Sequence, residues 1–216
     1  MIPGLTNPPL HASLAEIPES DLVRQLVADP RWHQWLFGLP GMTERPRVLQ
    51  MIDLRHAPGG FTGDVDILLV APDQPTVATA IEVKRIKVSA AAFNSGRPNK
   101  LQEYDKGVEQ ANRLAEVGFA QVYLYVIVVV DSRVRNEGRY TYDSLTPELT
   151  SAIQARISME RLAPSVGLVV HEFAQPMDHP PLTLALYGGN LKRPATVRVQ
   201  PADLTNWIVA VLDGAA

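Results

Sequence analysis

The amino-acid sequence predicts an α/β protein with a mixed central sheet of about four strands flanked by helices, followed by a C-terminal β-hairpin and helix. Short segments rich in β-branched residues alternate with segments whose apolar residues recur at helical spacing. Residues 121–131 are apolar almost throughout, as expected for a strand buried on both faces in the middle of an α/β sheet. The length of 216 residues and the 46% hydrophobic content are typical of one folded domain.

The expected helices are marked by apolar residues three and four positions apart and by the residues at their ends. A first helix should begin at about Glu19. A second should occupy residues 99–117 and end at Gly118, because glycine readily adopts the left-handed conformation that closes a helix. Two further helices are expected at residues 144–162 and 203–212.

The expected strands are short apolar or alternating segments bounded by glycine and proline. They lie at residues 47–55, 64–70, 78–86, 121–131 and 166–173. The C-terminal hairpin should be formed by residues 182–187 and 196–199, with Gly188-Gly189-Asn190 near the turn. A glycine-rich turn at residues 56–63 lacks the Gly-Lys-Ser/Thr ending of a phosphate-binding P-loop.

Three parts of one domain are expected along the chain: an extended arm at residues 1–18, an α/β core at 19–180, and an extension of the same domain at 181–216. The first part has no basic segment followed by an apolar one, so it does not resemble a signal peptide. The longest apolar run, Val122 to Val130, is too short to cross a bilayer as a helix. We therefore expect a soluble, cytoplasmic protein with no membrane partner.

Composition excludes several classes of chemistry. The sequence contains no cysteine, which removes disulfides, thiolate metal sites and cysteine nucleophiles. His171-Glu172 begins like a zinc-protease motif, but position 175 is Gln where that motif has a second His. The formal net charge is −3, so any surface that binds nucleic acid must be a local concentration of basic residues.

Candidate catalytic residues lie on two neighbouring strands. Strand side chains alternate between faces, so Asp64 and Asp66 share one face, and Glu82 and Lys84 share a face on the next strand. If the two strands pair symmetrically about Gln74, Asp66 lies opposite Glu82 and Asp64 opposite Lys84. Directly opposed residues have Cβ atoms roughly 4.5–5.5 Å apart. The sequence thus predicts two acids and one lysine in a single cluster.

Two carboxylates this close repel each other unless a cation lies between them. Oxygen ligands with few protein contacts suit Mg²⁺, with Mn²⁺ as a substitute, and leave room for a substrate phosphate. Such an ion lowers the pKa of a bound water and stabilises charge in phosphoryl transfer, and Lys84 is placed to orient or help deprotonate that water. The alternative is a solvated sheet face on which Lys84 balances the acids. Asp64 is either an outer-shell acid or a partner of Lys84.

At these residues the sequence resembles the PD-(D/E)xK nuclease superfamily, which has the restriction-endonuclease-like fold. The matching segments are Gly63-Asp-Val-Asp66-Ile-Leu-Leu-Val70 and Ala80-Ile-Glu82-Val-Lys84, and the resemblance covers residues 47–131. It implies Asp66, Glu82 and the Val83 carbonyl as metal ligands and Lys84 as the catalytic lysine. Val65 stands where the family's first motif has proline.

The resemblance also suggests supporting residues. In several branches of the superfamily a glutamine or a basic residue on the helix after these strands lines the active site; Gln110 resembles that glutamine, and Gly107 one turn earlier would allow close approach. Members of the superfamily often have a glutamate on the first helix that reaches the metal, for which Glu19 is a candidate beside Glu16 and Glu44. The alternative for Gln110 is a side chain that faces solvent. The alternative for Glu19 is a carboxylate that only interacts favourably with the helix dipole.

Basic residues concentrate after the third strand, in a stretch from Val83 to Gln102 without any acid. Arg85, Lys87, Arg97 and Lys100 are candidates for contacts with a nucleic-acid backbone, the alternative being a solvated charge run. A second basic group, formed by Lys192, Arg193 and Arg198, could extend this surface.

The function expected from these features is Mg²⁺-dependent hydrolysis of phosphodiester bonds in nucleic acid, with DNA favoured as the substrate. A homodimer would suit cleavage of both strands. One alternative is a catalytically inactive nucleic-acid-binding or assembly module that keeps the nuclease fold. Another is an unrelated α/β protein in which the Asp66, Glu82 and Lys84 pattern is accidental.

Overall fold

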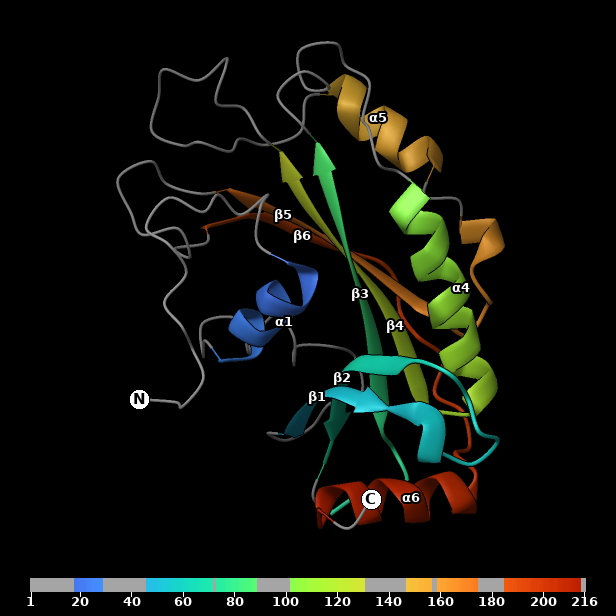
Figure 1. Cartoon of the computed structure of the whole chain (residues 1–216). Coiled ribbons are helices and arrows are strands. Elements are labelled where there is room, and N and C mark those ends of the chain that lie inside the picture. Colours follow the sequence, from blue (N-terminus) through green and yellow to red (C-terminus); the bar gives the residue numbers. More distant parts are fainter. Residues whose placement is uncertain are drawn as a thin grey trace.

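A computed structural model of the chain describes residues 18–28, 46–71, 73–88, 102–130, 147–156, 159–174 and 185–214. These residues form a six-stranded mixed sheet with helices on both of its faces (Figure 1). The predicted α/β class and mixed sheet are confirmed, but the sheet has six strands where about four were expected. The expected N-terminal arm lies almost entirely outside the described residues.

The strands lie in the sheet in the order in which they occur along the chain. Neighbouring strands are antiparallel except that β3, β4 and β5 run parallel, and α4 and α5 lie in the two connections between these three. The strands are β1 (Arg47–Asp53), β2 (Asp64–Val70), β3 (Thr79–Val88), β4 (Gln121–Val130), β5 (Gly167–Ala174) and β6 (Ala185–Arg193).

Helices cover the sheet on both sides (Figure 1). On one face, α1 (Glu19–Ala28) buries Leu22, Val23 and Leu26 in a cluster that includes Tyr123 and Tyr125 of β4. On the other, α4, α5 and α6 contribute to a second cluster that includes Leu124 and Val126. Consecutive residues of β4 therefore enter opposite cores, which confirms burial on both faces. The helices of the second cluster are α4 (Gln102–Val117), α5 (Pro147–Arg156) and α6 (Ala202–Leu212).

The ends of the helices agree with the sequence prediction in part. Helix α1 begins at Glu19, and α4 is followed by Gly118 with a φ of 102°. Of the helix expected at residues 144–162, α5 is helical as predicted, whereas residues 159–161 form a 3₁₀ turn, η2 (Met159–Arg161); residues 144–146 and 157–158 lie outside the described residues. The side chain of Asn112 on α4 bonds to the Arg161 carbonyl (2.9 Å) and to the Ala163 N–H (2.7 Å), so tertiary contacts fix the turn at this point.

The predicted C-terminal hairpin is wrong. Gly188-Gly189-Asn190 lies inside the continuous strand β6, which pairs antiparallel with β5, and residues 196–199 belong to no strand. The backbone groups along the edge of β5 need partners, and β6 supplies them with two register irregularities. The segment after β6 instead attaches to loops, since the Arg198 N–H donates to the Ala120 carbonyl at 2.8 Å.

Gln200 joins three parts of the chain at the base of the sheet. Its Oε1 accepts from the N–H groups of Ala78 (3.2 Å) and Ala120 (3.4 Å), and its Nε2 donates to the Pro75 carbonyl and to Thr205 Oγ1 (both 2.9 Å). These bonds fix the β2–β3 turn against the start of β4 and α6. The β2–β3 hairpin is thus anchored at its turn. No described helix has the length and apolar character that crossing a membrane requires.

Candidate active site

The predicted register of the β2–β3 hairpin is confirmed. Ile67 pairs with Ile81 and Leu69 with Thr79, so the strands are symmetric about Gln74, at which two consecutive turns meet. The paired register ends at the Ile67–Ile81 pair. The next position on each strand carries an acid, Asp66 on β2 and Glu82 on β3.

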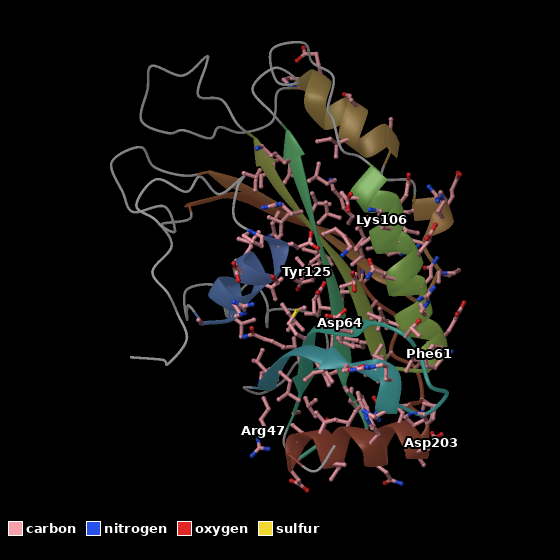
Figure 2. All side chains as sticks on the ribbon, in the orientation of Figure 1. Arg47, Phe61, Asp64, Lys106, Tyr125 and Asp203 are labelled. Atoms are coloured by element: carbon pink, nitrogen blue, oxygen red, sulfur yellow. The ribbon has the colours of Figure 1, made fainter. Side chains whose placement is uncertain are left out.

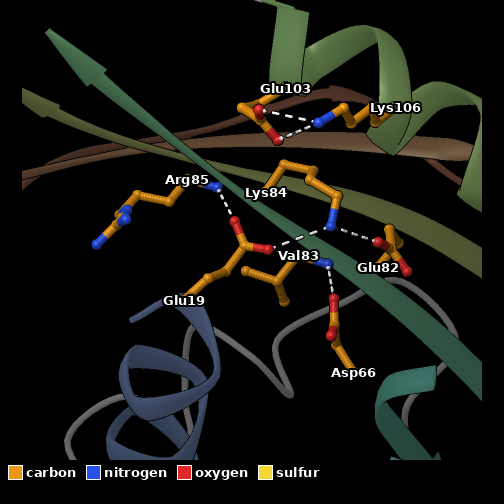
Figure 3. A network of polar contacts seen from close by, with 8 residues as sticks. All are labelled: Glu19, Asp66, Glu82, Val83, Lys84, Arg85, Glu103 and Lys106. Atoms are coloured by element: carbon orange, nitrogen blue, oxygen red, sulfur yellow. Dashed lines mark hydrogen bonds and ion pairs between the residues drawn. The ribbon is translucent and has the colours of Figure 1, made fainter. Parts of the chain in front are cut away.

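Carboxylates occupy the edge of β3 beyond the last pair. The Val83 N–H donates to Asp66 Oδ2 and the Arg85 N–H donates to Glu19 Oε2, each at 2.7 Å (Figure 3). Two backbone donors that continued pairing of β3 with the neighbouring chain would have bonded are therefore satisfied by acids. The N–H and C=O groups of one strand residue point to the same edge, so the Val83 carbonyl also faces β2.

Lys84 lies among the acids. Its Nζ is 2.7 Å from Glu82 Oε1 and 3.2 Å from Glu19 Oε1 (Figure 3). The contact with Glu82 is an ion pair without the direction of a good hydrogen bond. The side chains of Lys84 and Glu82 are only 9% and 2% exposed, whereas that of Glu19 is 32% exposed. The cluster is consequently screened from water on its inner side and open near α1.

Helix α4 packs directly on the lysine stem at Gly107. A Cβ atom added there would lie 2.4 Å from Lys84 Cγ and 3.1 Å from Leu124 Cδ1. Glycine inside a helix is destabilising compared with alanine, so its presence here is explained by the close approach of helix and lysine. Lys84 is thus held at its stem by α4 and at its tip by Glu82 and Glu19.

Burial and neighbouring carboxylates shift the pKa values of Asp66 and Glu82 upward. Desolvation raises the pKa of Asp66 to about 6, although the Val83 N–H and Lys84 oppose the shift. Desolvation and the charge of Asp66 raise the pKa of Glu82 to about 8. Burial alone would lower the pKa of Lys84, but Glu82 and Glu19 outweigh it, so its pKa is raised and the side chain is an ammonium at neutral pH.

The remaining predicted site residues are placed as follows. Asp64 is half-buried at the start of β2, and its charge helps to raise the pKa of Asp66 (Figure 2). Lys84 pairs with Glu82 and Glu19, not with Asp64 as its opposed position had suggested. Gln110 is half-buried one helical turn after Gly107.

The predicted basic surface remains a prediction. Arg85 and Lys87 alternate with Lys84 along β3, so their side chains start from the opposite face of the sheet. Arg97 and Lys100 lie outside the described residues, as do Glu16 and Glu44. Two members of the second basic group, Arg193 and Arg198, have structural roles, because they bond to backbone carbonyls. Arg193 donates to the carbonyls of Leu162, Ala163 and Val166, and Arg198 donates to the Ala115 carbonyl at 3.1 Å.

Glu19 is the member of the cluster that the sequence indicated least clearly. Its only signal was its position at the start of the first helix. The docking of α1 on the sheet brings its carboxylate to the edge of β3, where it bonds to Arg85 and Lys84. Local sequence could not reveal this, because the contact joins residues more than sixty positions apart.

The donor set consists of carboxylates and one backbone carbonyl. In the part of the chain that the structure describes, no three His, Cys, Asp or Glu side chains form a group that could hold a metal ion. In comparisons with known proteins, the sequence matches no protein-family model and no curated protein. The function must therefore be inferred from the chemistry of the cluster itself.

Proposed function

We propose that this protein is a Mg²⁺-dependent nuclease that hydrolyses phosphodiester bonds in nucleic acid, with DNA as the favoured substrate. We further propose that its sheet is that of the restriction-endonuclease-like PD-(D/E)xK superfamily. One observation carries both proposals: Asp66, Glu82 and Lys84 meet where the β2–β3 ladder ends. Two buried acids with raised pKa values are unfavourable for a hairpin that serves only the fold, and such groups are typical of functional sites.

The chemistry of the donors fits Mg²⁺. Asp66, Glu82 and the Val83 carbonyl would supply hard oxygen ligands, which Mg²⁺ prefers. When bound, the ion would lower the pKa of a coordinated water and offset charge on the phosphoryl group. Desolvation is the main cause of both raised pKa values, and neighbouring carboxylates add to it: Glu19 and Asp64 act on Asp66, and Asp66 acts on Glu82. A bound cation would offset this repulsion, because it stabilises the ionised forms of the acids.

Lys84 is suited to orient the attacking water or a phosphate oxygen, and not to accept a proton. Its raised pKa keeps it charged, so it can donate hydrogen bonds to an attacking water or to a phosphate oxygen. Glu19 offers a second carboxylate at 3.2 Å that does not belong to the proposed ligand set. Lys84 therefore retains a counter-charge when Glu82 binds a cation. Gly107 and α4 shield the lysine stem from water.

The direct test is incubation of the protein with single- and double-stranded DNA and RNA in Mg²⁺, Mn²⁺ or EDTA. Cleavage is expected with either ion and not with EDTA. Because Lys84 acts as a charged hydrogen-bond donor, Lys84→Ala should reduce single-turnover cleavage by a factor on the order of 10²–10³ while Mn²⁺ still raises the melting temperature. Lys106→Ala, which changes a 64% exposed lysine on α4, is the matched control and should cleave normally. Activity that survives in EDTA or in Glu82→Gln would refute the proposal.

The ion pairs of Lys84 with Glu82 and Glu19 also suit a second candidate, an inactive nucleic-acid-binding module that keeps this cluster for stability. That candidate predicts binding of nucleic acid without cleavage and no change of melting temperature with Mn²⁺. The same measurements on the wild-type protein separate the two candidates.

A further inference from the structure

A cavity beside the Asp66, Glu82 and Lys84 cluster suggests where a part of the substrate next to the scissile phosphate binds. We propose that it binds one unstacked nucleobase, that of the nucleotide next to the scissile phosphate, and that Met51 packs against this base. The inference rests on the proposed nuclease function. It identifies the substrate as a nucleic acid with an unpaired or locally opened base at the cleavage position.

The cavity has a volume of about 370 Å³ and lies where β1 ends and β2 begins. Its lining residues are Met51, Asp53, Arg55, Gly63 and Asp64. Volumes at the lower end of the range for ligand pockets suit a group of the size of one base. Asp64 lies two residues from Asp66 on the same strand, about 6.5 Å along it, so a nucleotide held at Asp66 would reach the cavity.

Met51 has a conformation that the fold does not explain. It is the one non-glycine residue with positive φ (51°) among the described residues, although it lies inside a strand. Gln50 pairs with Ile67 and Ile52 with Val65, so the register places Met51 across from Asp66. The side chain is also 39% exposed. Strained residues persist where function requires them, and here the strain presents an apolar, polarisable side chain beside the candidate metal ligand.

Arg55 supplies a fixed set of hydrogen-bond donors at the same cavity. Asp53 Oδ1 accepts from the Arg55 N–H (2.8 Å), and Asp53 Oδ2 accepts from Nε (2.7 Å) and forms an ion pair with Nη2 (2.5 Å), which orients the guanidinium. Of the five N–H donors of the guanidinium, the one on Nε bonds to Asp53, and the side chain remains 73% exposed. The others can donate to ring nitrogens or carbonyl groups of a base.

The charge of the cavity favours a base over a second phosphate. Asp53 and Arg55 neutralise each other, and Asp64 adds a carboxylate, so the lining is not positive. A phosphate would be repelled, whereas a neutral base can pack on Met51 and accept hydrogen bonds from Arg55. Bases in a duplex are stacked and cannot enter, which is why the inference requires an unstacked nucleotide.

The test is a mutant cycle between the protein and the substrate. Oligonucleotides carry a single abasic residue on one side or the other of the bond that the wild-type protein cleaves, and single-turnover rates are compared at limiting protein. For the wild type, loss of the base on one side should reduce cleavage about fivefold or more. Met51→Ala should lose a similar factor on the intact oligonucleotide and nothing further on the abasic one. Met159→Ala, which changes another exposed methionine (44%), should behave like the wild type.

A second variant keeps the inference testable if Met51→Ala is unstable. Met51→Gly removes the strain, so its melting temperature should rise while its cleavage of the intact oligonucleotide falls. Equal sensitivity of the wild type and both variants to the abasic residue would overturn the base-binding cavity and leave the nuclease proposal intact. A wild-type protein that cleaves nothing with Mg²⁺ or Mn²⁺ would overturn both.

Discussion

Replacement of Gly107 by alanine tests whether the contact between α4 and Lys84 is as close as the structure indicates. The new Cβ would lie 2.4 Å from Lys84 Cγ, a separation that real Cβ atoms essentially never show. Lys84 has little room to move, because it is buried and its tip is held by two carboxylates. Overpacking of this kind costs about 1–3 kcal/mol, and the gain in helix propensity offsets up to about 1 kcal/mol of it. We expect Gly107→Ala to lose about 1–2 kcal/mol of unfolding free energy and to impair cleavage.

The decisive comparison is the same change in a Lys84→Ala background. That background removes Cγ, so the nearest remaining atom of residue 84 is Cβ at 3.4 Å, an ordinary contact, while Leu124 Cδ1 stays at 3.1 Å and must shift slightly. Gly107→Ala should then be close to neutral, because the gain in helix propensity of up to about 1 kcal/mol offsets the shift of Leu124. Urea denaturation of the four proteins measures this without any substrate. Glu109→Ala, an exposed change on the same helix, should have the same small effect in both backgrounds. An equal loss from Gly107→Ala in both backgrounds would refute the packing argument.

Three further predictions follow from the site, the base of the sheet and the basic stretch. The pKa of Glu82 in the fold (about 8) is above its ordinary value of 4.5, so its contribution to stability is present at low pH and is lost as the pH rises from about 5 to 8. In EDTA, the wild-type protein should therefore lose stability relative to Glu82→Gln over that pH range. Parallel curves of stability against pH for the two proteins would contradict the assigned pKa. Gln200→Ala should lower the unfolding free energy by about 2–4 kcal/mol, because it leaves buried N–H groups without an acceptor, while the rate of cleavage per folded molecule stays normal in single-turnover assays. Charge reversal at Arg97 and Lys100 should weaken nucleic-acid binding and flatten its salt dependence while Mn²⁺ binding persists; an unchanged salt slope would exclude these residues from the interface.

Most of the sheet and the core of the site could be predicted because they depend on local periodicity. Alternation on β2 and β3 and a symmetric turn about Gln74 were enough to place Asp66, Glu82 and Lys84 together. The choice of strand partner near the C-terminus was not local. Gly188-Gly189 suits a turn as well as an irregular strand, and only the unpaired edge of β5 decides between them.

The basic residues illustrate a second limit of sequence reasoning. A cluster of arginines near the C-terminus reads equally well as a phosphate-binding surface or as structural donors. Arg193 and Arg198 bond to backbone carbonyls, which are potential acceptors on every residue and therefore leave no mark in the sequence. Glu19 escaped clear assignment for the same reason, since one of its two partners is the backbone N–H of Arg85.

The way the β2–β3 ladder ends also determines which variants can test the chemistry. Asp66 is proposed as a metal ligand, yet its carboxylate is also the acceptor for the Val83 N–H at 2.7 Å. Asp66→Ala would therefore leave a buried donor unsatisfied, at about 1–3 kcal/mol, and would weaken the fold and the site together. Asp66→Asn keeps an oxygen acceptor for that N–H while it removes the charge that a cation needs. A loss of Mn²⁺ binding in Asp66→Asn with near-normal stability would therefore isolate the ligand role from the structural one. Equal losses of stability and Mn²⁺ binding would indicate that Asp66 serves mainly to end the ladder.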